Sequence, residues 1–138
     1  MKKLGKIYNA ELYYLKVGRS LPRWSGTYPT VILEGFDDFS EAEIIHMYRQ
    51  GVRNFTVTGS ESSRTEDIVM DNIIANQVYG KVAKDDFYTT PYMSFVEGLQ
   101  MTVSSMKHNP EEAPILIVTK HMSEDTIRSI LKEEGGIK

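Results

Sequence analysis

Short apolar runs alternate along the chain with segments whose apolar residues recur every three or four positions. This alternation predicts β-strands separated by amphipathic α-helices. The runs that predict strands are rich in β-branched and aromatic residues, and three of them end immediately before a glycine. They cover residues 6–17, 30–34, 52–58 and 115–119.

The first two helices are predicted from capping boxes, in which a serine is followed three residues later by a glutamate. Ser40 and Glu43 form the first box, and Gly51 stands where the C-cap of that helix belongs. Ser63 and Glu66 form the second box, which opens a helix predicted to end near residue 80. The apolar residues expected to share one face of this second helix are Ile68, Val69, Ile73 and Ile74.

Proline and serine mark the ends of the other two helices. Pro91, directly after Thr90, is predicted to occupy the first turn of the third helix, and Pro110 to stop it. Residues 81–89 then form a polar connection, and Ser123 caps a final helix that ends at the glycine pair 135–136. The residues of the third helix expected to be buried are Phe95, Leu99, Met101, Val103 and Met106.

Strands that read as continuous apolar runs between amphipathic helices are typical of a parallel sheet covered on both faces. The predicted fold class is therefore α/β, a three-layer sandwich with a mostly parallel, Rossmann-like sheet. The run at residues 6–17 is more amphipathic and rich in tyrosine, so we expect it to be an edge strand or an antiparallel addition. With 138 residues, no repeat and no linker, we expect residues 1–138 to form a single α/β domain.

Composition narrows the classes of protein further. The chain has no cysteine, which excludes disulfides and thiolate metal ligands. Its apolar runs are far shorter than the roughly 20 residues that a membrane-spanning helix needs, so we expect no membrane association. No apolar segment typical of a secretory signal follows Met1, and we therefore expect a cytoplasmic location.

Charge is distributed unevenly along the chain. The formal net charge is −3, but residues 1–27 carry a balance of +5 and the remainder −8. Tyr8, Arg23 and Trp24 lie in this basic segment, and cations beside aromatic rings are the groups that contact phosphates and stack on bases. Solvated lysines on one face of a strand would explain the same composition without any ligand.

Ligands of open parallel sheets bind beyond the carboxyl ends of the strands, where loops lead into helix N-termini. The loop after residues 52–58 suits an anion, because it combines a glycine, serine hydroxyls, the free amides of a helix start and a guanidinium. The ends of the runs at 30–34 and 115–119 are expected to border the same crevice. The candidate ligand-binding residues are Thr58, Gly59, Ser60, Ser62, Ser63, Arg64, Lys120, His121 and Glu34, together with Tyr8, Arg23 and Trp24.

These residues also admit an interpretation without a ligand. The serines would then only cap a helix, and Glu61 and Glu66 would neutralise Arg64 locally. The loop matches neither the Walker motif nor GxGxxG nor the GxSxG elbow, so its ligand class rests on fold analogy alone. The histidines lack the spacing of a metal site, and neither a metal nor a cofactor is expected.

Three functions fit this pattern. The first is a binding protein that captures or sequesters a phosphate-bearing, nucleotide-like small molecule, such as a nucleotide second messenger. We expect it to be a homo-oligomer, because so small a chain offers few pocket walls of its own. The second is a small hydrolase or glycosyl-bond-cleaving enzyme, with His121 or Glu34 as acid or base and Ser60 or Arg64 on the phosphate.

The third function is a protein or nucleic-acid interaction module that uses the basic, aromatic N-terminal segment. The negative net charge does not favour nucleic acid as a partner. No catalytic constellation is recognisable and no catalytic residue is assigned, so the sequence favours ligand binding over catalysis.

Overall fold

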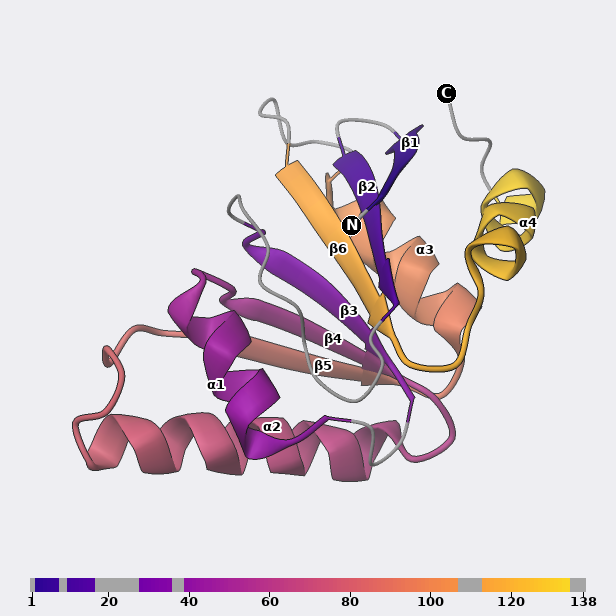
Figure 1. The fold of residues 1–138 in the computed structure, drawn as a ribbon. Helices are drawn as coiled ribbons and strands as arrows, with labels where there is room; N and C mark the ends of the chain where they lie inside the picture. Colours follow the sequence, from indigo (N-terminus) through magenta and orange to yellow (C-terminus); the bar gives the residue numbers. More distant parts are fainter. Residues whose placement is uncertain (1, 8–9, 17–27, 36–38, 107–112, 135–138) are drawn as a thin grey trace.

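One six-stranded sheet with helices on both faces organises the protein (Figure 1). The computed structural model describes residues 2–7, 10–16, 28–35, 39–106 and 113–134. The predicted fold class, a mostly parallel, Rossmann-like α/β sandwich, is confirmed. The strands are β1 (Lys2–Ile7), β2 (Ala10–Lys16), β3 (Thr30–Glu34), β4 (Asn54–Thr58), β5 (Tyr88–Tyr92) and β6 (Ala113–Thr119).

The strands lie in the order β1-β2-β6-β3-β4-β5. All neighbouring strands are parallel except β1, which pairs antiparallel with β2 at one edge. The expected antiparallel addition is thus present, but the prediction of a single strand over residues 6–17 is wrong. Two strands share this region because Leu4 and Ile7 of β1 are also buried, so the first residues of the chain contribute to the core.

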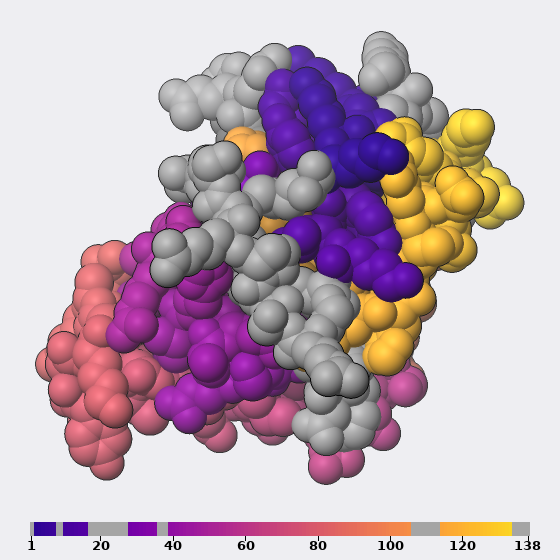
Figure 2. All heavy atoms as spheres, in the orientation of Figure 1, coloured from indigo at the N-terminus to yellow at the C-terminus, as the bar shows by residue number. Residues whose placement is uncertain are grey.

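Two pairs of helices cover the two faces of the sheet, and each face has its own hydrophobic core (Figure 1). The helices α1 (Glu41–Arg49) and α2 (Ser62–Val78) pack on one face, and α3 (Phe95–Met106) and α4 (Glu124–Glu134) on the other. We call these the α1/α2 face and the α3/α4 face. In the space-filling view the indigo atoms of β1 and β2 lie beside the yellow atoms of α4 (Figure 2).

The caps predicted for α1 and α4 are confirmed. The Ser40 hydroxyl accepts from the Glu43 amide at 3.2 Å, and the Ser40 amide donates to Glu43 Oε1 at 3.0 Å, which completes the capping box. Gly51 follows the C-cap residue of α1. At α4 the Ser123 hydroxyl accepts from the Thr126 amide at 3.2 Å.

The capping box predicted for α2 is wrong. The N-cap is Glu61, with no side-chain capping bond, and the helix begins at Ser62. It begins early because the Ser62 amide already donates to the Gly59 carbonyl at 3.1 Å, which starts the turn before Ser63. The Glu66 carboxylate instead accepts from Thr89 of β5 at 3.1 Å.

The buried face of α2 also differs from the predicted apolar stripe. Val69 and Ile73 are buried as expected, whereas Ile68 and Ile74 are exposed. Three polar residues complete the buried face, and they share the helical spacing of Val69 and Ile73. They are Ser62, Thr65 and Asn76.

Pro91 lies in the edge strand β5 and does not start a helix, which corrects the prediction for residues 81–91. In the parallel register, Tyr88 and Tyr92 direct their backbone groups to β4. The Tyr88 amide donates to the Arg53 carbonyl, and the Gly59 amide donates to the Tyr92 carbonyl. Pro91 falls on the outward side, where its missing N–H costs no ladder bond. The helix begins at Phe95, after Ser94 accepts a bond from the Glu97 amide at 3.1 Å.

Helix α3 lies very close to β4 at Gly98. A Cβ placed on Gly98 would meet the Thr58 Cγ2 atom at 2.4 Å, so only glycine fits this contact. Of the residues predicted to be buried in α3, Met101 is exposed. Phe95, Leu99 and Val103 are buried as predicted.

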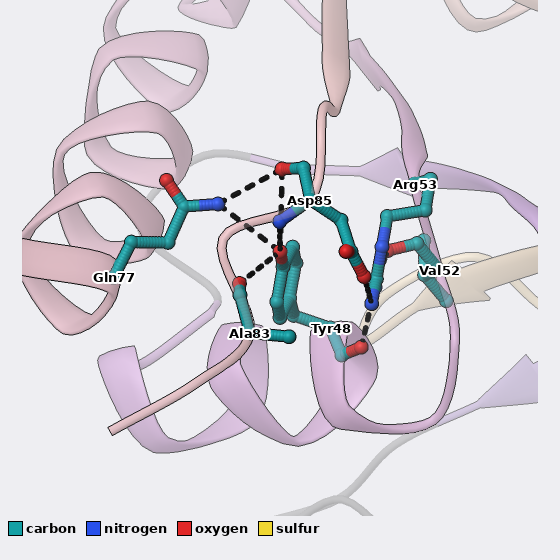
Figure 3. Close-up of polar contacts among 6 residues, drawn as sticks. All are labelled: Tyr48, Val52, Arg53, Gln77, Ala83 and Asp85. Carbon is teal, nitrogen blue, oxygen red and sulfur yellow. Dashed lines mark hydrogen bonds and ion pairs between the residues drawn. The ribbon is translucent and has the colours of Figure 1, made fainter. Parts of the chain in front are cut away.

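The connection from α2 to β5 is held at the amino end of β4 by a polar cluster around Tyr48 (Figure 3). The buried Tyr48 hydroxyl contacts the Ala83 carbonyl at 2.5 Å and accepts from the Gln77 amide group at 3.0 Å and the Asp85 backbone amide at 3.1 Å. Arg53 stacks on the Tyr48 ring and pairs with the Asp85 carboxylate at 2.8 Å. Asp85 is therefore anchored by an arginine and helps to hold this connection in place.

No helix in the described part of the chain combines the length and the apolar character that a membrane crossing requires.

Candidate functional site

Five polar or aromatic side chains form one row across the carboxyl edge of the sheet. The register of the parallel strands places their last residues side by side. The row consists of Lys16, Thr119, Glu34, Thr58 and Tyr92. The preceding row is apolar and belongs to the α1/α2 core through Leu15, Val118, Leu33 and Val57. The carboxyl edge thus changes from apolar to polar within one residue.

The centre of this row is the topological switch point of the sheet. β3 and β6 are parallel neighbours, but the chain leaves β3 towards α1 and leaves β6 towards α4 on the opposite face. A crevice between diverging loops is where ligands of such sheets bind. Here the Thr119 hydroxyl donates to Glu34 Oε2 at 2.6 Å and so joins the two strand ends.

Thr119 holds the turn after β6 in place. Its hydroxyl accepts from the backbone amides of His121 and Met122 at 3.2 and 3.1 Å. The Met122 carbonyl in turn accepts from the Tyr14 hydroxyl at 2.8 Å, and burial raises the pKa of Tyr14 above its usual value. Glu34 is therefore oriented by a hydroxyl that is itself fixed by the backbone.

On the α1/α2 side the switch point is crossed by an ion pair. Lys120 Nζ lies 3.3 Å from Glu43 Oε1, and the two side chains are only 20% and 9% exposed. Glu43 is also the N3 residue of the α1 capping box, so one carboxylate oxygen serves both contacts. Its other oxygen, Oε2, is buried and has no hydrogen-bond partner in the described part of the chain. Lys120 thus joins β6 to α1 rather than to the loop after β4.

The loop after β4 follows the predicted course in part. Gly59 has φ +131°, a conformation that favours glycine, and its backbone lies against Gly35 at the end of β3. The amides of Gly59, Ser62 and Arg64 donate to backbone carbonyls, which removes them from an anion. Within the described part of the chain, no carbonyl accepts from the amides of residues 60, 61 and 63.

The side chains of this loop divide into two groups. Ser62 and Thr58 are buried, and the Thr58 hydroxyl donates to the Leu33 carbonyl at 3.4 Å. Ser60, Ser63 and Arg64 are exposed at the start of α2. The Arg64 guanidinium lies 3.7 Å from the Glu61 carboxylate. This local pairing is the one expected if the loop binds no ligand.

The structure brings together some of the predicted site residues and separates others. Glu34 is the register neighbour of both Thr58 and Thr119, so it lies between the Gly59 loop and the turn that carries Lys120 and His121. His121 is exposed. The remaining candidates lie outside the described residues; they are Tyr8, Arg23 and Trp24.

Sequence reasoning missed one cation at this edge. Lys16, the register partner of Thr119, lies at the end of β2 and lines a surface hollow of about 340 Å³ with Lys2, Tyr14 and Leu15. Because residues 6–17 were predicted to form a single strand, residue 16 was not recognised as the carboxyl end of a strand in the parallel part of the sheet. The basic character of residues 1–27 was the available signal.

Comparison of the chain with protein-family models, with curated proteins and with solved structures finds no match. Among the described residues, no group of three or more histidine, aspartate or glutamate side chains is arranged to hold a metal ion. The site is therefore interpreted from its own geometry.

Proposed function

We propose that the protein binds a phosphate-bearing, nucleotide-like small molecule at the carboxyl edge of β6, β3 and β4. The observation that carries this proposal is the Glu34 carboxylate at the switch point. Thr119 fixes one of its oxygens, while Oε1 has no hydrogen-bond partner among the residues described and the side chain is half-buried. Such a carboxylate is suited to accept bonds from the hydroxyls of a sugar.

The start of α2 supplies the complementary half of the site. The amides of residues 60, 61 and 63, the positive end of a 17-residue helix and the Arg64 guanidinium favour a phosphate group. Glu34 and Thr58 lie on neighbouring strands, which are about 4.8 Å apart. The Glu34 carboxylate and the start of α2 therefore border the same end of the sheet.

The proposal concerns capture of the ligand rather than its conversion. The two candidate acid–base groups, Glu34 and His121, lie at the ends of different strands, and the Thr119 hydroxyl binds both the Glu34 carboxylate and the His121 backbone amide. One Glu34 carboxylate oxygen and the His121 backbone amide therefore help to hold the turn after β6. A second copy of the chain would supply further walls to this open edge, and the proposal includes a cytoplasmic homo-oligomer.

Thermal unfolding against a panel of nucleoside mono-, di- and triphosphates and cyclic nucleotides tests the proposal. At least one compound is expected to raise the melting temperature in proportion to the logarithm of its concentration, and chromatography should recover it unchanged. If no compound in the panel stabilises the protein, the proposal is wrong. Conversion of the compound to a product would favour an enzyme.

Two variants assign the response to the site. Arg64→Ala should abolish or weaken the stabilisation by the ligand while changing the melting temperature without ligand little, because the side chain is 70% exposed. Lys84→Ala is the matched control. It also removes an exposed cation, but from the α2–β5 connection, which leads to the amino ends of the strands. An Arg64→Ala protein that responds like the control would contradict the assignment.

A further inference from the structure

The α3/α4 face of the sheet is apolar over one half and polar over the other. Its core residues come from β1, β2, β3 and β6, and among the described residues none comes from β4 or β5. Side chains alternate between faces along a strand, and Phe55 and Val57 of β4 point into the α1/α2 core. The residues of β4 and β5 that face α3 are consequently Asn54, Thr56, Thr58, Tyr88, Thr90 and Tyr92.

A pocket of about 230 Å³ lies between this polar half and α3. Among the described lining residues, every side chain except that of Met101 carries a hydroxyl or an amide, and none is charged. The lining residues are Thr30, Asn54, Thr56, Thr90, Tyr92, Met101, Thr102 and Ser105. The pocket is thus built by three adjacent strands and one helix, which are rigid elements.

Several polar groups of the pocket have no hydrogen-bond partner among the residues that the structure describes. Thr30 is only 4% exposed, and within the described part of the chain its hydroxyl makes no hydrogen bond. The same holds for the side chains of Asn54 and Thr90. Thr56 and Thr102 bond to each other at 3.1 Å, and each hydroxyl keeps further hydrogen-bonding capacity. Thr30 is almost fully buried, and buried polar groups are normally satisfied, so its hydroxyl is suited to a partner that enters the pocket. Asn54 and Thr90 are exposed and offer their polar groups to the same occupant.

The pocket is separate from the carboxyl edge. Gly98 brings α3 into contact with Thr58 and Tyr92, the last residues of β4 and β5 in the edge row. Beyond this contact, the pocket continues towards Thr30 and Asn54 at the opposite ends of their strands. A ligand bound there would therefore not depend on the Glu34 carboxylate.

We propose that this pocket binds an uncharged ring that carries several hydrogen-bonding groups, the chemistry that nucleosides and monosaccharides share. The lining residues that the structure describes have no charge to balance an ionic ligand, and hydroxyl groups can both donate and accept. Met101 and Tyr92 provide apolar surface for the flat side of a ring. The volume is below the roughly 300–1,000 Å³ typical of pockets for drug-sized ligands, which limits the occupant to about one substituted ring.

Saturation-transfer NMR with adenosine, uridine and glucose at millimolar concentration tests this proposal. Ser105→Phe should fill the pocket from α3, and Ser104→Phe is the matched control, because it adds the same side chain at a neighbouring exposed position that does not line the pocket. At least one probe should bind the wild-type protein and the Ser104→Phe variant, and bind Ser105→Phe at least about tenfold more weakly. Adenosine or uridine alone would identify a nucleoside pocket, and glucose alone a sugar pocket.

Two outcomes would overturn the proposal. One is that none of the three probes binds the wild-type protein; the other is that both phenylalanine variants bind a probe equally well. Glu34→Gln separates this site from the carboxyl edge, since it should leave binding of the uncharged probes unchanged. The two proposals are tested independently. If no nucleotide stabilises the protein in thermal unfolding, the proposed function is wrong but the pocket can still bind an uncharged probe. If no uncharged probe binds, the pocket proposal is wrong but nucleotide stabilisation can still be observed.

Discussion

The Thr119 hydroxyl donates a 2.6 Å hydrogen bond to the Glu34 carboxylate, and this contact joins the ends of two parallel strands whose chains leave to opposite faces of the sheet. The same hydroxyl accepts from two backbone amides of the following turn. One side chain therefore fixes both the orientation of Glu34 and the path of the chain into α4.

Thr119→Val should lower the free energy of unfolding by about 1–3 kcal/mol, because two backbone amides lose their acceptor and Glu34 loses its donor. Thr119→Ser keeps the hydroxyl and should cost less. Thr90→Val is the control, since Thr90 is exposed on the edge strand and makes no hydrogen bond within the described residues. Urea unfolding measures all three. Equal effects of the two valine substitutions would contradict the role given to the Thr119 hydroxyl.

Gly98→Ala should destabilise the protein by about 1–3 kcal/mol through overpacking, although alanine is the better helix former by about 1 kcal/mol. The cause is the Thr58 Cγ2 atom, which lies 2.4 Å from the position of the new methyl group. Thr58→Ser removes that atom and keeps the hydroxyl. A double-mutant cycle measured by urea unfolding should therefore show that Thr58→Ser relieves much of the Gly98→Ala penalty, whereas additive effects would argue against this contact.

Tyr48→Phe should cost about 1–3 kcal/mol, because the hydroxyl at the centre of the cluster in Figure 3 is buried and contacts the 83–85 segment and Gln77. Tyr79→Phe removes the same group from a ring that is 78% exposed and should change stability by less than about 0.5 kcal/mol. Hydrogen exchange should show faster opening of the 81–87 connection only in the first variant. Unchanged exchange there would mean that another contact holds the connection.

Glu124 at the start of α4 should titrate below the usual value of 4.5. Hydrogen bonds from Arg128 and then from Lys2 lower its pKa. A carboxyl whose pKa is lower in the folded protein contributes stability above the unfolded pKa, near 4.5, and that contribution is lost as the pH falls through the folded value. Acid should accordingly weaken the attachment of α4 to β1 in the pH range below 4.5.

NMR titration of the Glu124 carboxyl carbon checks this pH dependence. Arg128→Gln and Lys2→Gln should each raise the pKa of Glu124, because each removes a positive charge that bonds to the carboxylate and lowers its pKa. Lys132→Gln, at an exposed position of the same helix, is the control and should leave the pKa of Glu124 where it was. An unchanged pKa in both Arg128→Gln and Lys2→Gln would contradict the role given to these two contacts.

The predictable parts of the fold are those determined by local signals. The apolar run at β3 predicts a strand, and the capping box of Ser40 and Glu43 predicts the start of a helix, each from only a few neighbouring residues. Both predictions are confirmed. Pro91 misled the prediction because the meaning of a proline depends on whether its strand is an edge, which only the sheet order decides. Gly98 is understood only through its contact with Thr58, 40 positions earlier in the chain.

The candidate site was predictable to a similar extent. Parallel strands present their carboxyl ends at the same end of the sheet. This rule placed Glu34 and Thr58 close together, and they are register neighbours in the structure. The partners of the charged groups were not predictable, since the pairing of Lys120 with Glu43 depends on how α1 packs beside β6. The polar pocket beside α3 was missed for the same reason, because it combines residues from four elements.

The most direct test of the central claim is an NMR titration with the nucleotide that stabilises the protein most, observed at the backbone amides. The proposal predicts saturable shifts that are concentrated at residues 34–35, 59–64 and 119–121, and that are lost in Glu34→Gln or Arg64→Ala. Saturable shifts confined to other parts of the sheet, or no shifts at millimolar nucleotide, would contradict it.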